Sequence, residues 1–358
     1  MRSLRILTQV NPRIRQALIA VAIVLFAAGS VTGQTRRYPA YPTNTNRVIA
    51  GAQAQKSDPK QAEYTFVELD PLGQGVGYCY ADAHAINNSD QVVVDWSDPA
   101  DCNVLHASLW DKGKWALLDY PVDPNCAEPA TYLTSLTDWG FAFGTYWSAC
   151  PYEPAGGVYV KTRRWYFLPD IPGYPYNQGV SMSDNGLALG GASVWDSESN
   201  QWINKHWLWD GRRYIFPTYP SEWDVSAFWA GPLFINNKGQ IVGQFVDIAT
   251  GRMRGFLQYG SKLTAFDAPG NPTEGTFVND MNNAGYAVLA GIYDDDASPY
   301  YPSTSFLLRE GKFTALPHVP FDDVAWSVVF GVNDRGDMVG RWWDSNNNMH
   351  PYVAFRKK

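Results

Sequence analysis

Asparagine, lysine and glycine residues gather in the segment INNKGQIVGQF, Ile235 to Phe245, between two apolar runs. Amide oxygens, an ammonium group and turn backbone at this spacing could bind a metal ion, a phosphate or a sugar. The segment recurs, however, in six similar copies: INNSDQVVV from Ile86, LTDWGFAFG from Leu136, MSDNGLALG from Met182, INNKGQIVG from Ile235, MNNAGYAVL from Met281 and VNDRGDMVG from Val332. Such repetition favours a structural role over a single site.

Each copy has the chemistry of a short hairpin turn. An apolar residue precedes two residues drawn mostly from Asn, Asp, Ser and Thr, then a free position, a Gly and an apolar alternation. Asn and Asp start turns by bonding to their own backbone, and Gly adopts the positive φ that closes them. Asp90 replaces Gly in the first copy, since Asp tolerates this conformation better than most residues. The pattern predicts a turn between two strands, with Ile235 and Val242 in the core.

Two further markers give the repeat a period of 49 or 50 residues. A small residue and an aromatic or branched one recur in the strands ASLW, GVYV, HWLW, GFLQ, SFLL and AFRK. Seven residues later stands an apolar or aromatic marker, found at Trp115, Trp165, Tyr214, Leu263 and Phe313. The sixth would fall beyond Lys358, and Phe66, 49 residues before Trp115, takes its place. The missing last strand therefore lies at the beginning of the repeat region.

A strand displaced in this way is typical of a closed β-propeller. We predict an all-β fold, a six-bladed β-propeller of four-stranded antiparallel blades, in which the N-terminal strand at 64–70 completes the last blade beside the strand at 351–356. The composition agrees, with 15 Trp, 21 Tyr, 17 Phe, 31 Gly and 24 Pro. No helical periodicity extends beyond two turns.

The hairpin INNxGQxVG, the small-aromatic strand that follows it and the turn into a Leu-Asp or Leu-Pro ending resemble the HAF repeat of extracellular bacterial proteins. The resemblance spans residues 64 to 358. The literal His-Ala-Phe is echoed only by His106-Ala107-Ser108 and His206-Trp207. The resemblance implies a repeat architecture and no particular activity.

The N-terminal region predicts export. Residues 1–33 combine four arginines, a 12-residue apolar run and small residues before Gly33, which is the pattern of a signal peptide; an uncleaved anchor is the alternative. Residues 34–62 are rich in Pro, Asn and Gln and predict a flexible leader, which leaves 63–358 for the propeller. Removing the four arginines takes the net charge from −7 to −11, so we expect no nucleic-acid partner and no membrane insertion after cleavage. The expected location is secreted or periplasmic.

Four cysteines lie in the first two repeats. The repeat relates Cys79 to Cys126 and Cys102 to Cys150, and each pair straddles one hairpin. We therefore predict the disulfides Cys79–Cys102 and Cys126–Cys150, each contributing about 3 kcal/mol by the chain-entropy model. Free thiols are the alternative.

Sequence signatures of catalysis and of cofactors are absent, with no HExxH, GxSxG, P-loop or dinucleotide motif, and no cofactor is expected. The five histidines are scattered, so we expect no metal centre. The carboxylates Asp294, Asp295 and Asp296 could bind Ca²⁺, but they lack the glycine-punctuated spacing of a calcium loop, which favours a solvated loop.

Aromatic residues supply the candidate binding site. Six residues before each hairpin anchor, where the first strand of each blade should begin, stand Tyr80, Ala130, Tyr176, Trp229, Gly275 and Trp326. The four large rings, Tyr80, Tyr176, Trp229 and Trp326, would lie on the same face as long loops rich in Trp, Tyr, Asp and Asn. Rings beside carboxylates and amides suit sugars, which offer an apolar face and hydroxyls. Aromatic packing between blades is the alternative reading.

Three functions are compatible with this sequence. The leading hypothesis is a secreted, non-enzymatic propeller that binds a carbohydrate or another extracellular partner, such as a protein, through its loop-rich face. The second is a polysaccharide hydrolase or lyase with carboxylates at the central funnel, for which Asp82, Asp280 and Asp294 are the candidates. The third is a structural module of the cell envelope.

Overall fold

The protein is described here by a computed structural model, which covers residues 63–75, 77–99, 101–120, 130–147, 158–161, 164–226, 230–270, 275–292 and 303–357. Every named element in these ranges is a β-strand, so the all-β expectation is confirmed. The predicted signal peptide and leader lie outside the described residues. Within the described ranges, no helix has the length and apolar character needed to cross a membrane.

The strands form six antiparallel groups that follow one another along the chain. Group 1 contains β2 (Ala81–Ile86), β3 (Gln91–Asp98), β4 (Asp101–Asp111) and β5 (Lys114–Leu117). Group 2 contains β6 (Ala130–Leu136), β7 (Ala142–Trp147), β8 (Val158–Lys161) and β9 (Arg164–Phe167). Group 3 contains β10 (Tyr176–Met182), β11 (Ala188–Asp196), β12 (Gln201–Trp209) and β13 (Tyr214–Ile215).

The second half of the chain repeats this arrangement with small variations. Group 4 contains β14 (Trp223–Asp224), β15 (Gly231–Ile235), β16 (Gln240–Asp247), β17 (Met253–Tyr259) and β18 (Lys262–Phe266). Group 5 contains β19 (Gly275–Met281), β20 (Ala287–Ile292), β21 (Ser303–Arg309) and β22 (Lys312–Ala315). Group 6 contains β23 (Val324–Val332), β24 (Met338–Asp344), β25 (Met349–Arg356) and the N-terminal strand β1 (Tyr64–Glu68).

Hydrogen bonding assigns these groups to four sheets, none of which closes on itself within the described residues. Groups 1 and 2 share a sheet through one parallel bridge, Leu105 to Ala130. Groups 4 and 5 share another through the bridge between Met253 and Gly275. Because each link is a single residue pair, the antiparallel group is the basic unit of the fold.

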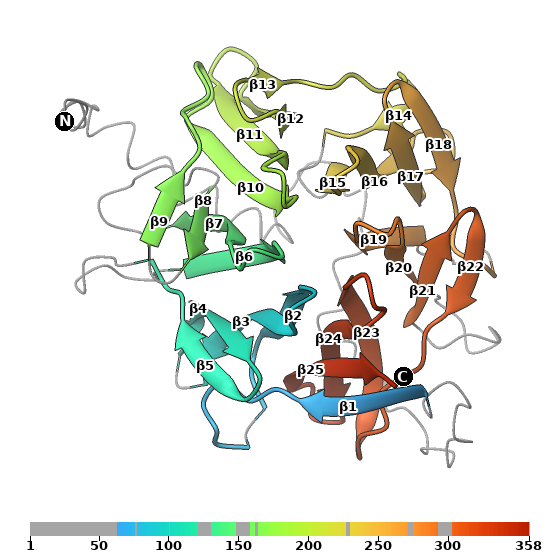
Figure 1. Ribbon diagram of the computed structural model, residues 1–358. Coiled ribbons are helices and arrows are strands. Elements are labelled where there is room, and N and C mark those ends of the chain that lie inside the picture. The colour runs from blue at the N-terminus through green and yellow to red at the C-terminus, as the bar shows by residue number, and fades with distance from the viewer. Residues whose placement is uncertain are drawn as a thin grey trace.

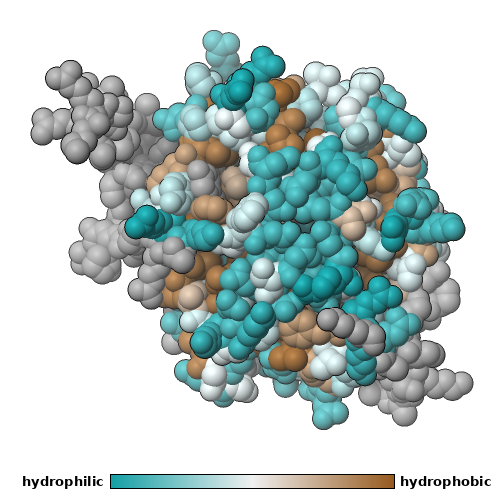
Figure 2. All heavy atoms as spheres, in the orientation of Figure 1, coloured by the Kyte–Doolittle hydropathy of each residue, from teal (hydrophilic) through white to brown (hydrophobic). Residues whose placement is uncertain are grey.

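The groups are arranged around a common centre (Figure 1). The first long strand of each group lies nearest the middle, and we call these the inner strands: β2, β6, β10, β15, β19 and β23. The blue β1 lies beside the red β25, and the two pair antiparallel from Tyr64–Arg356 to Glu68–Tyr352. Hydrophilic residues gather over the middle of the face shown in Figure 2.

The hydrophobic core is divided into clusters that lie between successive groups. One cluster packs Val93 and Ala107 of group 1 against Leu133 and Ala142 of group 2. The cluster that combines the two ends of the chain packs residues of β2 and β3 against Val339 of β24 and Val353 of β25. Each group is therefore stabilised mainly by burying apolar surface against its neighbours.

All six inner strands carry a β-bulge two residues before the hairpin anchor. The register shifts there, leaving one residue without a cross-strand partner: His84, Thr134, Val180, Leu233, Asn279 and Phe330. Four of the six copies have Gly at the last position of the motif, at Gly144, Gly190, Gly243 and Gly340. A Cβ at Gly243 would lie 2.1 Å from the carbonyl oxygen of Gly231, so only glycine fits without movement.

Candidate functional site

The hairpin segment around Asn236 has the turn geometry expected from its sequence. Asn236 Oδ1 accepts hydrogen bonds from the N–H groups of Lys238 and Gln240 at 3.0 and 3.1 Å. Gly239 adopts a φ of 70°, and both Ile235 and Val242 are buried. The side chain thus closes its own turn, as the repeat predicts.

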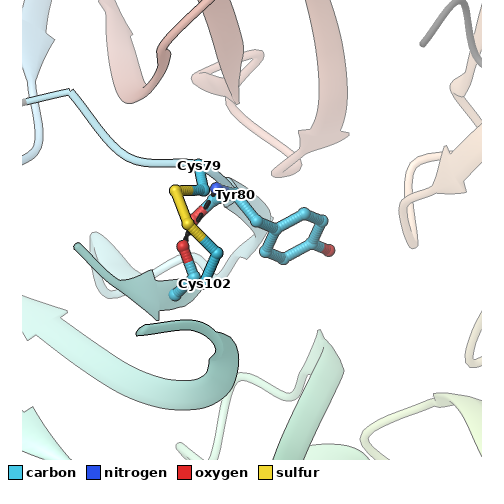
Figure 3. Close-up of a disulfide and its surroundings, with 4 residues drawn as sticks. Cys79, Tyr80 and Cys102 are labelled. Carbon is cyan, nitrogen blue, oxygen red and sulfur yellow. Dashed lines mark hydrogen bonds between the residues drawn. A yellow bond between two sulfur atoms is a disulfide. The ribbon is translucent and has the colours of Figure 1, made fainter. Parts of the chain in front are cut away.

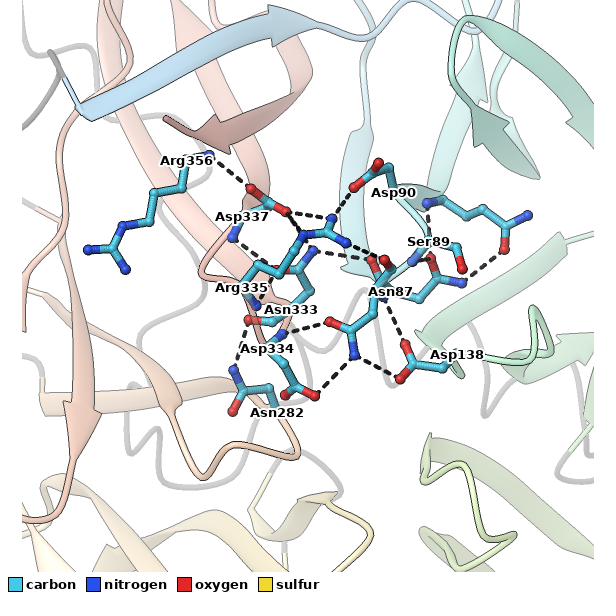
Figure 4. A network of polar contacts seen from close by, with 12 residues as sticks. Asn87, Ser89, Asp90, Asp138, Asn282, Asn333, Asp334, Arg335, Asp337 and Arg356 are labelled. Atoms are coloured by element: carbon cyan, nitrogen blue, oxygen red, sulfur yellow. Dashed lines mark hydrogen bonds and ion pairs between the residues drawn. The ribbon is translucent and has the colours of Figure 1, made fainter. Parts of the chain in front are cut away.

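The same asparagines also connect neighbouring hairpins, which the sequence reading missed. The Nδ2 atoms of Asn87, Asn236, Asn282 and Asn333 each donate to a backbone carbonyl of the next hairpin. The second residues of the hairpins extend this network, since Asn88 donates hydrogen bonds to both Asp138 and Asp334. Figure 4 labels these two carboxylates. A motif that recurs once per group is therefore also the contact between groups.

The second hairpin residues surround a small cavity. Its volume is about 60 Å³, and its lining includes Asp138, Asp184, Asp280, Asn283 and Asp334. This is room for a water molecule or two, against roughly 300–1,000 Å³ in typical ligand pockets. Within the described ranges, no group of three or more His, Cys, Asp and Glu side chains is placed to hold a metal ion. The hairpin end is thus a polar junction rather than a sugar site.

A buried cluster of charges lies where groups 6 and 1 meet, on strands β2, β3 and β24 and away from the hairpin turns. Arg341 Nη1 lies 2.7 Å from Asp82 Oδ1, and both side chains are only 6% exposed. His84 Nε2 lies 3.4 Å from Asp95 Oδ2 and 3.9 Å from Asp82 Oδ2. The Tyr80 hydroxyl lies 3.4 Å from the same nitrogen. Two carboxylates therefore face one guanidinium and one imidazole.

Burial and mutual charge shift the titration of this cluster. Burial raises the pKa of Asp95 to about 6, although His84 and the N–H of Leu133 favour its ionised form. Burial alone would lower the pKa of His84, but Asp95 and Asp82 outweigh it and raise that pKa. Burial, with the charge of Asp82, raises the pKa of Tyr80 well above its usual value, so its hydroxyl stays protonated. The charges compensate one another, which is what a buried ionic network requires.

Tyr80, the first of the predicted ring residues, lies beside this cluster and next to a disulfide. Its backbone N–H donates to Ser97 Oγ at 3.0 Å, and its ring lies 6.1 Å from that of Tyr132. Figure 3 shows the Tyr80 side chain pointing away from the bond between Cys79 and Cys102. The backbone of Tyr80 is therefore fixed by the neighbouring disulfide and by the hydrogen bond to Ser97.

Trp326 lies on the other side of the same cluster. It stacks on Trp343 with ring centroids 3.5 Å apart and an angle of 8° between the planes. The guanidinium of Arg341 lies over the ring of Trp343, 4.0 Å from its centroid. A chain of contacts therefore connects Tyr80 to Trp326. It passes through His84, the ion pair of Asp82 and Arg341, and Trp343.

Tyr176 is not part of this cluster. Tyr176 starts β10 and makes a T-shaped contact with Trp202 of β12, at 5.2 Å between centroids. Trp229 lies outside the described residues. The structure therefore places two of the four predicted rings beside the ionic cluster and a third in group 3.

The predicted disulfide Cys79–Cys102 is observed, with Cα atoms 5.8 Å apart. It links the segment before β2 to β4. Cys126 and Cys150 lie outside the described residues.

The three carboxylates considered for hydrolysis are placed differently. Asp82 is engaged by Arg341, as above. Asp280 is half-buried, lines the small cavity between the hairpins and accepts hydrogen bonds from the N–H groups of Met281 and Val332, and burial raises its pKa to about 7. Asp294, with Asp295 and Asp296, lies outside the described residues. Neither described carboxylate is presented openly to a substrate.

The functional residues missed by sequence reasoning are His84, Asp95 and Arg341. One local signal existed, because Tyr80, Asp82 and His84 are spaced at i, i+2 and i+4 and therefore share one face of a strand. Arg341 gave no such signal, since it is 259 residues from its partner Asp82.

No protein-family model and no curated protein sequence matches the chain. Several solved structures are similar at the level of overall shape. AofleA from Arthrobotrys oligospora has a TM-score of 0.45 and 14% identity, over 81% of this chain and 86% of that one. XC5397 from Xanthomonas campestris, a gluconolactonase, has a TM-score of 0.45 and 8% identity, over 83% and 91%. The SapL1 lectin, solved with alpha methyl fucoside, has a TM-score of 0.45 and 13% identity, over 76% and 91%. Similarities at this level do not assign a function.

Proposed function

We propose that the six strand groups are the blades of a closed six-bladed β-propeller whose last blade is completed by the N-terminal strand, with a repeat of the HAF type. Pairing of β1 with β25 supports closure, as do the core cluster shared by β2, β3, β24 and β25 and the hydrogen bond from Asn333 to Asn87. Closure of this kind protects strand edges and ties the chain ends together.

The propeller is a secreted or periplasmic, non-enzymatic protein that binds a carbohydrate through the face where the inner strands begin. The disulfide between Cys79 and Cys102 is compatible with an oxidising compartment. The residues of the site are Tyr80, Tyr176 and Trp326, with Trp229 as the fourth candidate.

One observation carries this proposal. Tyr80 and Trp326 both remain partly exposed although they lie next to the buried ionic cluster of Asp82 and Arg341. Aromatic rings fixed by ionic and stacking contacts, and still reachable by solvent, suit the apolar face of a sugar. They are also preorganised, which reduces the entropy cost of binding.

A glycan array probed with residues 34–358 tests this function. Tyr80→Ala and Trp326→Ala should each remove the array signal while Tyr259→Ala, at an exposed ring in the hairpin between β17 and β18, should retain it. Thermal melting of each variant checks that the fold is intact. Equal array signals from folded Tyr80→Ala, Trp326→Ala and the unchanged protein would overturn the proposal.

The hydrolase or lyase alternative has less support from the geometry. Asp95, whose pKa lies near 6, has no exposed surface, and Asp82 is held by Arg341. A general acid must reach the atom that it protonates. A purely structural envelope module is the outcome if no glycan or other extracellular partner binds.

A further inference from the structure

A second group of aromatic rings lies on one face of group 3, away from the ionic cluster. In antiparallel sheets, residues directly opposite each other share a face, as do residues two apart on one strand. The register pairs Tyr176 with Ser193, Ser193 with Asn204 and Trp195 with Trp202. All five side chains therefore occupy the same face of β10, β11 and β12.

The three rings on this face contact one another in sequence. Tyr176 meets Trp202 edge-on, with centroids 5.2 Å apart and 79° between the planes. Trp202 meets Trp195 at 5.3 Å and 60°. Trp195 is the open end of this row, with 42% of its surface exposed. Its neighbour Trp202 is held by rings on two sides, so Trp195 packs on a fixed support.

Polar groups accompany the rings on the same face. Ser193 Oγ donates to Asn204 Oδ1 at 2.6 Å, and Asn204 Nδ2 donates to the carbonyl of Ser226 at 3.0 Å. Among the described residues, the Tyr176 hydroxyl and the indole N–H groups of Trp195 and Trp202 have no hydrogen-bond partner. These three groups can bond to hydroxyls of a ligand without breaking an internal contact.

The five side chains that form this face are uncharged, so they offer no ion pair to an acidic ligand. Asp196 follows Trp195 directly on β11 and therefore alternates to the opposite face. Lys205, which follows Asn204 on β12, also alternates to the opposite face, where it lies over Tyr174 at 5.2 Å. Because both charged side chains lie on the other face, the face of the rings favours a neutral ligand.

We propose that Tyr176, Trp202 and Trp195 form a binding platform for a neutral pyranose, in which the sugar ring stacks on Trp195 and its hydroxyls bond to the free N–H and O–H donors. A pyranose is favoured because it combines an apolar face with several hydroxyls, matching flat rings whose polar atoms are unused. This inference rests on the proposed carbohydrate-binding function and names a second site for it. Tyr176 belongs to both sets of residues, whereas Tyr80 and Trp326 lie in groups 1 and 6, away from Trp195 and Trp202 of group 3.

The hairpin that carries Trp195 also offers a matched control. Ile203, on the opposite face of β12, is 40% exposed, nearly the same as Trp195. Replacing either residue with alanine removes a similarly exposed apolar side chain from the same hairpin. Only Trp195→Ala should affect a ligand on the platform.

The test is calorimetric titration of the protein with cellohexaose, xylohexaose, mannohexaose and chitohexaose, with hexagalacturonic acid as the acidic probe. At least one neutral hexasaccharide should bind and quench tryptophan fluorescence. Trp195→Ala should weaken that binding at least tenfold, Trp195→Phe only a few-fold, and Ile203→Ala should leave it unchanged. Melting temperatures verify folding.

Three results would overturn the platform: no binding by any neutral probe, tighter binding of hexagalacturonic acid, or equal affinities for Trp195→Ala and Ile203→Ala. The same titrations with Tyr80→Ala separate the two proposals. Binding that is lost in Tyr80→Ala and kept in Trp195→Ala rejects the platform and leaves the proposed function standing. Binding lost in Trp195→Ala and kept in Tyr80→Ala supports the platform and moves the function to group 3.

Discussion

Asn333 donates a hydrogen bond from Nδ2 to the backbone carbonyl of Asn87, 246 residues earlier in the chain, at 3.2 Å. The same asparagine accepts hydrogen bonds through Oδ1 from the N–H groups of Arg335 and Asp337, both at 3.0 Å. One side chain therefore closes a local turn and connects the last strand group to the first. The corresponding bond from Asn236 to Asn282 connects adjacent groups inside the repeat.

Replacing Asn333 with alanine should destabilise the protein by about 2–3 kcal/mol, because two turn N–H groups lose their acceptor and the Asn87 carbonyl keeps only the bond from the Asp90 N–H. Asn333→Asp retains the acceptor and loses the donor, so it should be intermediate. Urea unfolding measures both. Asn346→Ala, at an exposed turn residue, should change stability by less than about 0.5 kcal/mol. If Asn333→Ala matches Asn346→Ala, the bond between the ends contributes nothing.

The N-terminal strand should be essential to the fold. Deleting Glu63 to Asp70 removes β1 and the buried Leu69, and it exposes the edge of β25. Such a deletion should lower the melting temperature strongly, and a comparison deletion of Gln34 to Lys60 should have little effect. Calorimetry of the two variants checks this. Similar melting temperatures for both would contradict six-blade closure.

The turn chemistry and the terminal strand could be predicted because they are local or periodic. Asn236 and Gly239 carry the turn in their own side chain and backbone, and Phe66 follows from counting 49 residues back from Trp115. The ionic cluster could not be predicted in this way. The bulge at His84 is a shift of backbone register, and the partner of Asp82 comes from another strand group. The spacing of Tyr80, Asp82 and His84 hints at a shared strand face, but it shows neither the bulge nor the distant partner.

His350 should make stability depend on pH through the terminal strand. Its Nδ1 lies 2.9 Å from Glu68 of β1 and its Nε2 lies 3.6 Å from Asp344. Burial alone would lower the pKa of His350, but the two carboxylates outweigh it and raise that pKa. A raised pKa in the folded state contributes stability that is complete below the unfolded value, about 6.5, and is lost as pH rises through the folded value.

The melting temperature of His350→Gln should therefore fall furthest below that of the unchanged protein near pH 5.5. The gap should narrow toward pH 8.5, where His350 is neutral. A gap that is constant over this range, or that widens with pH, would show that the imidazolium does not hold the strand.

Asp280 should give a stability effect of the same sign with pH. Burial raises its pKa to about 7. Between the unfolded value of about 3.9 and pH 7 the folded protein keeps a proton that the unfolded chain releases, so stability falls as the pH rises through this range. In Asp280→Asn this titration is absent. The melting temperature of the variant, relative to the unchanged protein, should rise by several degrees between pH 5 and pH 8, since 1 kcal/mol corresponds to roughly 2–4 °C. A relative melting temperature that falls over this range would refute the assignment.

The pair formed by Arg341 and Asp82 should be costly to break and less costly to remove. Arg341→Met leaves the Asp82 carboxylate buried without its guanidinium, which should cost about 3–5 kcal/mol. Asp82→Leu conversely leaves the Arg341 guanidinium buried without the Asp82 carboxylate. In the double variant neither charge remains, so its loss of stability should be smaller than the sum of the two single losses by about 2 kcal/mol. Urea unfolding of the four proteins measures this coupling. Additive losses would mean that the two side chains act independently, and that Tyr80 and Trp326 are not held in place through this pair.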